Sequence, residues 1–314
     1  MTEKTTTGPA GDQDVTDGLA ELAASLGYTP PAVLSSGVEF LVYRASPTAG
    51  TARKDVVLRV PRARTFNTAN NVGVGAHALL EQELRLTQWL AADGFPVARA
   101  LGIEHTRTGT PVLVSSFVDS DPQAPDWSEV GALFASLHEK PVPDIAPVVQ
   151  YGQSVPELLA QRLPDRFARL LALRPDLGEL PERSSITARL AETPVRPALL
   201  HLDLRRQNLL CSRGRIAALI DWSNVLIGDP AMELARLSEY ALIRENGLDE
   251  QAIRRGYEAA GGSLAVTSAA DALYRLDTAV MLALVFNSVA PDPRLGPVQT
   301  ARVVELLQIL NDVW

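Results

Sequence analysis

The sequence predicts an α+β fold in which a strand-rich N-terminal part precedes a mainly helical C-terminal part. Segments with the pattern of β-strands dominate before residue 120, whereas helical patterns dominate after Pro122 and Pro125. A chain of 314 residues has room for two parts that each have their own hydrophobic core. We therefore expect an N-terminal lobe at 18–120 and a C-terminal lobe at 121–314.

Bulk composition narrows the class of protein. The chain has 46% hydrophobic and 21% charged residues, which is typical of a soluble globular protein. Its formal net charge of −8 argues against a nucleic-acid partner, because phosphate backbones favour basic surfaces. The apolar stretch at 279–289 is too short to cross a bilayer, so no membrane partner is expected.

The N-terminus and the single cysteine bear on the cellular compartment. Residues 1–17 are rich in Thr, Gly, Asp and Glu and lack an apolar core, so we expect a disordered tail and no signal peptide. Cys211 is the only cysteine and cannot form an intrachain disulfide, which fits a reducing compartment. The sequence therefore predicts a cytoplasmic protein in which Cys211 fills the core.

The first elements expected after the tail are a short helix and a hairpin. Apolar residues recur at helical spacing over 18–27, and Gly27 fits a helix C-cap. Residues 33–44 have the pattern of two strands joined by a small-residue turn at 35–37. The backbone N–H groups of such a turn can approach a bound oxygen closely, although the single glycine, Gly37, also fits a plain hairpin.

A strand and a helix then carry opposite charges that can pair. Residues 55–60 form a clear strand that contains Arg59, and 77–89 has the pattern of a helix that contains Glu81 and Glu83. Glu83 has the better spacing for an ion pair with Arg59. The alternative is that Arg59 simply faces solvent from the strand.

The segment between this strand and this helix resembles a dinucleotide fingerprint only superficially. Residues 73–78 match Gly-x-Gly-x-x-Ala, but the fingerprint requires a strand directly before it, and 67–71 has the composition of a loop. The chain also lacks a Gly-x-x-x-x-Gly-Lys-Ser/Thr segment. We therefore expect neither a dinucleotide-binding fold nor a P-loop.

Two further strands, at 97–103 and 111–118, complete the strand-rich part. A capping box formed by Asp126 and Glu129 begins a helix that we expect to end near His138. A histidine at the end of a helix most simply completes a core or a cap, so His138 is expected to be structural.

The C-terminal part is expected to be helical with one interruption. Residues 140–198 contain many prolines and short helical patterns and give no sharp prediction. Asp229 precedes Pro230 and is expected to cap a helix at 232–243. Three more helices are expected, at 249–260, 268–289 and 297–312.

The most informative stretch runs from Asp203 to Asp221. Two short apolar strands within it can form a hairpin that turns near Gly214. This hairpin places Asn208 and Asp221 nearly opposite each other at its open end, while Asp203 lies in the loop before it. A group that can accept a proton and two oxygen ligands would thus converge, and such ligands suit Mg²⁺.

Three motifs in this region resemble those of the aminoglycoside phosphotransferase family of small-molecule kinases. That family carries His-Gly-Asp-x-x-x-x-Asn, then Ile-Asp-Trp, then Gly-Asp-Pro-x-x-Asp-Leu-Ala. The corresponding segments here are 201–208, 220–222 and 228–235, in the same order. Two positions depart from the family pattern, because Leu202 replaces a glycine and Glu233 replaces an aspartate.

The resemblance extends more weakly over about residues 30–290 and implies a bilobal protein-kinase-like fold. In that fold the N-terminal lobe, an antiparallel sheet with one helix, would bind the nucleotide. The larger, mainly helical C-terminal lobe would hold the catalytic and substrate-binding groups. The cofactors implied are Mg²⁺ and ATP, with GTP as the alternative nucleotide.

The resemblance also implies roles for residues of the C-terminal lobe. Asp203 would accept or orient the proton of a substrate hydroxyl, and Asn208 and Asp221 would hold Mg²⁺. Arg205 would contact the γ-phosphoryl group, although a solvated arginine or a brace for the loop is an equal alternative. His201 is expected to fix the loop through hydrogen bonds rather than to do acid–base work.

In the N-terminal lobe the resemblance implies a nucleotide site. Arg59 would replace the lysine that binds the α- and β-phosphates, with Glu83 as its partner, and Gly37 would lie in the turn over the phosphates. The interlobe hinge would bind adenine through backbone groups. The hinge residues are Ser116, Phe117 and Val118.

The function expected is ATP-dependent phosphorylation of a hydroxyl group on a small molecule. One candidate substrate is an antibiotic, such as an aminoglycoside or a macrolide, in resistance or self-protection. The alternatives are a kinase of a small metabolite, such as an amino alcohol or a sugar, and a catalytically inactive kinase fold that only binds. A protein kinase is disfavoured, because Ile-Asp-Trp stands in place of Asp-Phe-Gly and no Ala-Pro-Glu segment follows. The oligomeric state is left open.

Overall fold

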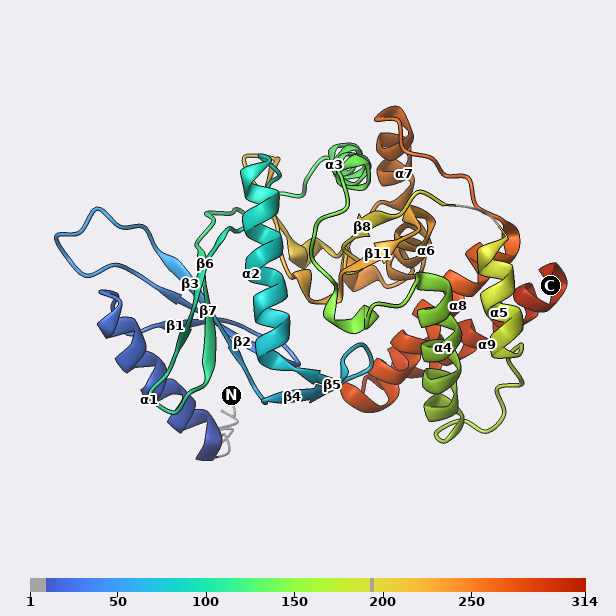
Figure 1. The fold of residues 1–314 in the computed structure, drawn as a ribbon, viewed down its shortest axis with the longest axis horizontal. Coiled ribbons are helices and arrows are strands. Elements are labelled where there is room, and N and C mark those ends of the chain that lie inside the picture. Colours follow the sequence, from blue (N-terminus) through green and yellow to red (C-terminus); the bar gives the residue numbers. More distant parts are fainter. Residues whose placement is uncertain (1–9, 193–194) are drawn as a thin grey trace, which may run out of the picture. The chain divides into compact units, whose positions relative to one another are not determined.

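The computed structural model describes residues 10–192 and 195–314, with side chains from Gly18 onward. The chain divides into two compact units, each of which is visible in Figure 1. The N-terminal unit comprises the residues up to Phe66 together with Gly75–Val118. The C-terminal unit comprises Asn67–Val74 and Asp119–Trp314.

The N-terminal unit is built on a five-stranded antiparallel sheet with the strand order β1-β2-β3-β7-β6. This confirms the predicted antiparallel sheet of the α+β fold. The strands are β1 (Ala32–Ser36), β2 (Phe40–Ala45), β3 (Val56–Pro61), β6 (Ala100–His105) and β7 (Pro111–Ser116).

The two faces of the sheet contact different helices. Alternate residues of β3, such as Leu58 and Val60, are buried in a cluster with Leu19 and Leu22 of α1 (Ala10–Ser25). Because successive side chains of a strand point to opposite faces, Arg59 lies on the other face of the sheet. The helix α2 (Ala76–Ala92) packs on that second face, as its contacts with β6 and β7 show.

Two short segments differ from the sequence prediction. Helix α1 begins at Ala10, so residues 10–17 are helical rather than disordered, while residues 1–9 of the predicted tail lie outside the described residues. The sequence from Asp12 to Asp17 contains no glycine or proline that would interrupt a helix, and the prediction weighed only its polarity.

The second difference is the short strand β5 (Val72–Gly75), which pairs with β4 (Thr65–Asn67) where the sequence indicated a loop. Both glycines of the apparent fingerprint, Gly73 and Gly75, lie within β5 instead of after it. The fingerprint requires a parallel βαβ unit, and the sheet here is antiparallel, so the dinucleotide interpretation is excluded on structural grounds.

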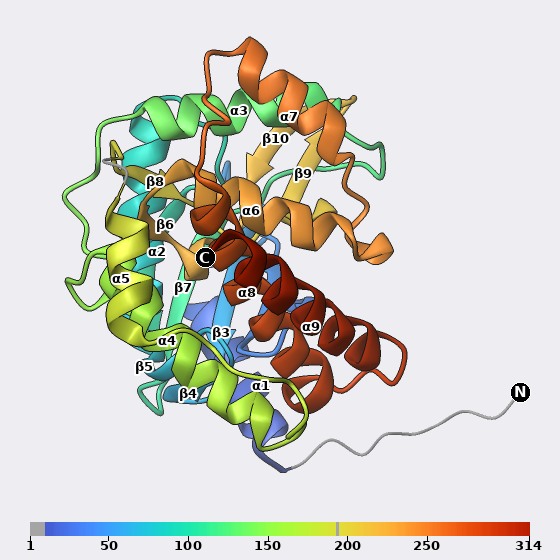
Figure 2. The same cartoon turned by 90° about the vertical axis from the view of Figure 1, so that its right-hand side faces the viewer.

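The C-terminal unit is mainly helical, and α8 and α9 lie side by side in it (Figure 2). Its core gathers buried residues from most of these helices. All five helices expected in this unit are present, and four of them differ from the prediction only slightly at their ends. The helices are α3 (Trp127–Glu139), α4 (Val155–Leu171), α5 (Arg183–Ala191), α6 (Pro230–Ala241), α7 (Glu250–Ala259), α8 (Ser268–Leu284) and α9 (Leu295–Val313).

Local capping chemistry explains where several of these helices begin. Asp126 caps the start of α3, as expected, but it accepts a hydrogen bond from the backbone N–H of Ser128 rather than from that of Glu129 as the predicted capping box requires. Ser154 and Glu157 form a reciprocal capping box at the start of α4, within the stretch for which we made no sharp prediction. The expected helix at 268–289 is α-helical only to Leu284 and continues as a π-helical turn.

Two antiparallel strand pairs lie among these helices. The strand β8 pairs with β11, and β9 pairs with β10. Within the described residues, no helix is long and apolar enough to cross a membrane. The strands are β8 (Ala198–Leu200), β9 (Leu209–Ser212), β10 (Arg215–Leu219) and β11 (Leu226–Gly228).

Helices α3 and α7 pack backbone against backbone through two glycines. A Cβ atom added to Gly131 of α3 would collide with the carbonyl oxygen of Ile253, and one added to Gly256 of α7 would collide with that of Ser128. These are main-chain atoms of facing helices, so neither collision can be relieved by moving a side chain. The close approach also brings His138 and Tyr257 into contact.

We predict that Gly131→Ala destabilises the protein by about 1–3 kcal/mol, because the steric cost of overpacking exceeds the helix propensity gained. Urea unfolding would measure the change. Gly102→Ala is the control, since a Cβ there meets no atom within 4 Å. Equal stability of the two variants would contradict the packing derived for α3 and α7.

Candidate active site

The loop that carries Asp203 is fixed at both of its ends by strand pairing. It leaves β8, runs through the short helix η2 (Arg206–Asn208) and enters the β9–β10 hairpin. The hairpin turns through Arg213 and Gly214, both at positive φ, as the sequence predicted for Gly214. The backbone N–H of Ile220 donates to the carbonyl oxygen of Asn208 over 3.0 Å. The residue before Asp221 is therefore tied directly to Asn208.

The Asp203 carboxylate is nearly buried and accepts hydrogen bonds from three side chains. Asn208 Nδ2 donates to Oδ2 over 2.9 Å, and also to the Asp203 carbonyl oxygen over 2.8 Å. Arg205 Nη2 donates to the same Oδ2 over 2.8 Å, and the Tyr240 hydroxyl donates to Oδ1 over 3.1 Å. Asp203 is 5% exposed, so its charge depends on these partners rather than on water.

The residues predicted to hold Mg²⁺ have oxygen atoms suited to a hard cation. Because the Asn208 amide nitrogen is directed to Asp203, its Oδ1 is left as an acceptor, and no group in the described part of the chain donates to it. Asp221 accepts a hydrogen bond from Ser223 Oγ over 3.1 Å and has a left-handed backbone with φ of 68°. One amide and one carboxylate fit a Mg²⁺ ion that keeps most of its water and phosphate ligands. Among the described residues no larger His, Cys, Asp or Glu cluster could hold a metal.

Glu233 holds the start of the loop through two backbone hydrogen bonds. Its carboxylate accepts from the N–H of His201 over 2.6 Å and from the N–H of Leu202 over 2.7 Å. The Glu233 side chain is buried in α6, and its two oxygens face consecutive N–H groups. The family's usual aspartate is thus replaced by a residue that still presents a carboxylate to the loop.

Leu202 adopts a conformation that favours glycine. Its φ of 60° lies in the left-handed region, where a leucine costs about 1–2 kcal/mol. Its side chain is 1% exposed and belongs to the core cluster of the C-terminal unit. Burial of a leucine contributes about 1.5–3 kcal/mol, which offsets the backbone cost. The replacement of the family's glycine is therefore accommodated by packing.

His201 serves the loop through both ring nitrogens, as expected. Its Nε2 lies 3.0 Å from the carbonyl oxygen of Ile220, and its Nδ1 accepts from the backbone N–H of Asp203 over 3.2 Å. The ring is fully buried and meets Trp222 edge to face. With both nitrogens occupied, His201 has no free site for proton transfer.

A buried histidine, His138, lies next to the Glu233 carboxylate. His138 shares a 2.8 Å hydrogen bond with the Tyr257 hydroxyl through Nδ1, and its Nε2 lies 3.8 Å from Glu233 Oε2. Burial acts to raise the pKa of Glu233, but the neighbouring His138 and the N–H of Leu202 outweigh it and hold the pKa below the ordinary 4.5. These contacts fit the expected structural role of His138.

Arg205 lies beside two carboxylates. Although burial would lower it, the pKa of the Arg205 guanidinium is raised by the charge of Asp203 and, more weakly, of Asp221. Its Nη2 pairs with Asp203, while its Nε is buried without a hydrogen-bond acceptor. The contact with Asp203 braces the loop, which was one of the alternatives expected for Arg205. The N–H groups that do not contact Asp203 are left for a further acceptor.

In the N-terminal unit, the predicted ion pair between Arg59 and Glu83 is present. Arg59 Nη1 lies 2.7 Å from Glu83 Oε2, and both side chains are 12% exposed. The guanidinium also stacks over the Phe40 ring at 4.2 Å. Glu81 instead pairs with His77 on the helix surface. Arg59 therefore does not face solvent freely from its strand.

The remaining predicted nucleotide-site residues lie at the ends of strands of the same sheet. Gly37 is in the exposed turn between β1 and β2, where its N–H donates to the Phe40 carbonyl oxygen. Ser116 ends β7, and Phe117 N–H donates to the Asp55 carbonyl oxygen. Val118 is the last residue of the unit. Their contacts with a nucleotide stay a prediction.

Tyr240 is the residue of this site that the sequence reasoning missed. It contacts Asp203 from 37 positions further along the chain. Its place in α6, nearly three turns after the Gly-Asp-Pro motif, gives no local pattern that distinguishes it from a core tyrosine.

The geometry described so far agrees with a family assignment from sequence comparison. The model of the phosphotransferase enzyme family matches residues 32–272. This chain belongs to that family. The resemblance inferred from the three motifs is thereby confirmed. Among curated proteins, homoserine kinase of Pseudomonas aeruginosa is 31% identical over 186 residues, which are 53% of this chain and 55% of that protein. The chain thus spans about half the length of the curated relatives it matches.

Solved structures of small-molecule kinases share the fold. Macrolide 2'-phosphotransferase type I has a TM-score of 0.55 at 18% identity, covering 95% of this chain and 99% of that chain. A choline/ethanolamine kinase family protein from Mesorhizobium loti has a TM-score of 0.61 at 18% identity, with coverage of 96% and 98%. Aminoglycoside phosphotransferase APH(4)-Ia, in a ternary complex with AMP-PNP and hygromycin B, has a TM-score of 0.61 at 17% identity, with coverage of 93% and 98%. The predicted protein-kinase-like fold is therefore confirmed.

We predict that stability falls in acid partly through Glu233. Because its folded-state pKa is below the unfolded value near 4.5, its contribution is present above that pH and is lost as the pH falls through the folded-state pKa. Glu233→Gln should lower the free energy of unfolding by about 1–3 kcal/mol near neutral pH and should make this free energy less dependent on pH in acid. Urea unfolding between about pH 6 and pH 3 measures the free energy of unfolding and its pH dependence. Parallel pH dependence in the two proteins would contradict this account.

Proposed function

We propose that this protein transfers the γ-phosphoryl group of ATP to a hydroxyl group of a small molecule. The observation that carries the proposal is the direct contact of Asp203 with Asn208, with Asp221 tied to the same hairpin end. Phosphoryl transfer asks the protein for positioning and for stabilisation of charge more than for covalent chemistry. A buried carboxylate beside oxygen ligands for a cation meets both needs.

In the proposed step, the substrate hydroxyl oxygen attacks the γ-phosphorus, and the bond from that phosphorus to the β–γ bridging oxygen breaks. The products are a phosphate monoester and ADP, and the hydroxyl proton passes to the Asp203 carboxylate. Arg205, which already lies at Asp203 and whose side chain is 37% exposed, would contact the transferred phosphoryl group. His201 would keep the loop in place.

Asn208 and Asp221 would hold Mg²⁺, and the oxygen chemistry of one amide and one carboxylate at the same hairpin end supports this assignment. Bound Mg²⁺ would neutralise charge on the phosphate oxygens. In the N-terminal unit, Arg59 fixed by Glu83 is the residue we assign to the α- and β-phosphates, and the Gly37 turn and the 116–118 backbone are assigned to the rest of the nucleotide. A cytoplasmic location is part of the proposal and is supported by the buried free thiol of Cys211.

The comparisons support two classes of candidate substrate. The likeness to macrolide and aminoglycoside phosphotransferases supports an antibiotic hydroxyl in a resistance or self-protection reaction. The likeness to homoserine kinase supports a hydroxylated metabolite. The rival reading, an inactive kinase fold that only binds ligands, gains support only from Arg59 in place of lysine.

A coupled ADP-release screen tests the proposed function. The panel should include macrolides, hygromycin B, choline, sugars and hydroxy amino acids such as homoserine, with each phosphorylated position read by NMR. We expect turnover with at least one hydroxylated acceptor of this panel. Nucleotide binding without ADP release from any acceptor, and without slow ATP hydrolysis, would favour the inactive reading.

We predict that Asp203→Asn lowers turnover by about 10²–10⁴-fold while nucleotide affinity changes little, because the amide keeps the shape but cannot accept the proton. Initial rates and calorimetry measure the two quantities. The control Asp312→Asn removes an exposed carboxylate near the end of α9 and should leave turnover unchanged. Near-normal turnover of Asp203→Asn would remove Asp203 from its role.

We also predict that Asp221→Ala weakens nucleotide binding in the presence of Mg²⁺ by about tenfold or more, or about 1.4 kcal/mol, and changes it little without Mg²⁺. Calorimetry with and without the ion separates the two cases. The same loss in both conditions would show that Asp221 acts on the fold rather than on the metal.

A further inference from the structure

We propose that Tyr240, held by Arg236, is a positioning residue that orients the Asp203 carboxylate so that its Oδ1 receives the substrate hydroxyl. This inference deepens the proposed function and rests on it. It concerns three residues of the C-terminal unit, Asp203 in the loop and the other two in α6.

The first step is the contact itself. The Tyr240 hydroxyl lies 3.1 Å from Asp203 Oδ1, and each residue is 5% exposed. A hydrogen bond between buried groups is not exchanged with water, so it restricts the rotation of the carboxylate. No residue in the described part of the chain other than Tyr240 donates to Oδ1.

The second step is the direction of the hydrogen bond. Arg236 Nη2 and Nε approach the Tyr240 oxygen at 3.0 and 3.3 Å. A guanidinium can only donate, so the tyrosine oxygen accepts from Arg236 and its own proton is left for Asp203. Burial raises the pKa of Tyr240 to about 12 against the opposing charge of Arg236, so the hydroxyl keeps its proton at neutral pH. Tyr240 is therefore a fixed donor to an ionised carboxylate.

The third step counts the acceptor sites on Asp203. An ionised carboxylate offers about four lone-pair sites, two on each oxygen. Asn208 and Arg205 occupy both sites on Oδ2, and Tyr240 occupies one on Oδ1. The remaining site is on Oδ1. The substrate hydroxyl is thus expected to donate to the oxygen that Tyr240 also contacts.

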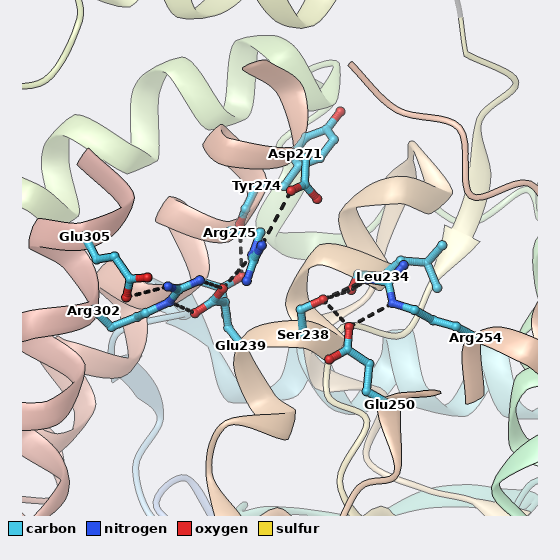
Figure 3. A network of polar contacts seen from close by, with 11 residues as sticks. Leu234, Ser238, Glu239, Glu250, Arg254, Asp271, Tyr274, Arg275, Arg302 and Glu305 are labelled. Atoms are coloured by element: carbon cyan, nitrogen blue, oxygen red, sulfur yellow. Dashed lines mark hydrogen bonds and ion pairs between the residues drawn. The ribbon is translucent and has the colours of Figure 1, made fainter. Parts of the chain in front are cut away.

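The fourth step is the rigidity of α6 at this point (Figure 3). Glu239, next to Tyr240, is fully buried and accepts hydrogen bonds of 2.7 to 2.9 Å from Arg275 of α8 and Arg302 of α9. On the same helix, Ser238 donates to Glu250 and accepts from Arg254, both of α7. Three helices therefore hold the turn of α6 that carries Tyr240, which is what precise positioning of a catalytic group requires.

The test compares Tyr240→Phe with Tyr274→Phe. Tyr274 is a matched control, because its buried hydroxyl also donates to a carboxylate of the same unit, Asp229 Oδ2, over 3.1 Å. We expect Tyr240→Phe to lower kcat by about 10–100-fold with KM for ATP changed less than about threefold. Tyr274→Phe should stay within about twofold of the natural protein in kcat, whereas Tyr240→Phe should lose more Tm because it also leaves the buried Arg236 guanidinium without its acceptor.

A spectroscopic measurement makes the inference independent of turnover. In protein labelled with ¹³C at Asp carboxyl carbons, the Asp203 signal is assigned through Asp203→Asn. Tyr240→Phe should shift that signal, whereas Tyr274→Phe should shift the Asp229 signal instead. If Tyr240→Phe does not fold, the double variant Tyr240→Phe with Arg236→Met removes the stranded charge and is measured in the same way.

The outcomes separate the two proposals. An unshifted Asp203 signal in Tyr240→Phe overturns the inference whatever the activity of the protein. A shifted signal with unchanged kcat also overturns it, because the contact would then be structural only. Absence of phosphoryl transfer by the natural protein, together with a shifted signal, overturns the proposed function and with it the catalytic reading of Tyr240, while the hydrogen bond stands.

Discussion

The site depends on one interaction, the pair of hydrogen bonds from the backbone N–H groups of His201 and Leu202 to the Glu233 carboxylate. It fixes the start of a loop that has no regular structure of its own before η2. A charged acceptor bound to two buried N–H groups is stronger than a neutral one, and removal of either partner would leave a buried group unsatisfied. Asp203 follows directly after these two residues, so its position is set by α6.

Helix α6 connects the loop to the rest of the C-terminal unit. Its first turn presents Glu233 to the loop, and its last turn presents Tyr240, held by Arg236, to Asp203. Glu239 binds α8 and α9. Buried charges are stable only when partners of good geometry bind them. The buried side chains of Glu233, Arg236 and Glu239 each have at least one such partner. Helix α6 thus holds both the backbone at the start of the loop and the Asp203 side chain.

Much of the fold and part of the site could be predicted because they depend on local chemistry. The spacing of Asp203, Asn208 and the hairpin turn at Gly214 is a property of adjacent residues, and so are the caps of α3 and α6. The helices α4 and α5, the strand β5 and the early start of α1 could not be predicted with confidence. Their patterns are short or polar, and tertiary packing decides such segments.

The sequence alone identified the family and the order of the three motifs along the chain, because motif spacing and hydrophobic periodicity act over a few residues. The tertiary structure brought Tyr240 to Asp203, gave Leu202 a left-handed backbone and paired Arg205 with Asp203. The contact of Tyr240 depends on a partner 37 residues away, and the conformation of Leu202 depends on its burial and on Glu233. Arg205 and Asp203 are only two residues apart, and their pairing depends on the burial of Asp203. The energy of a buried hydrogen bond or of a strained residue is set by that surrounding packing, which no local pattern encodes.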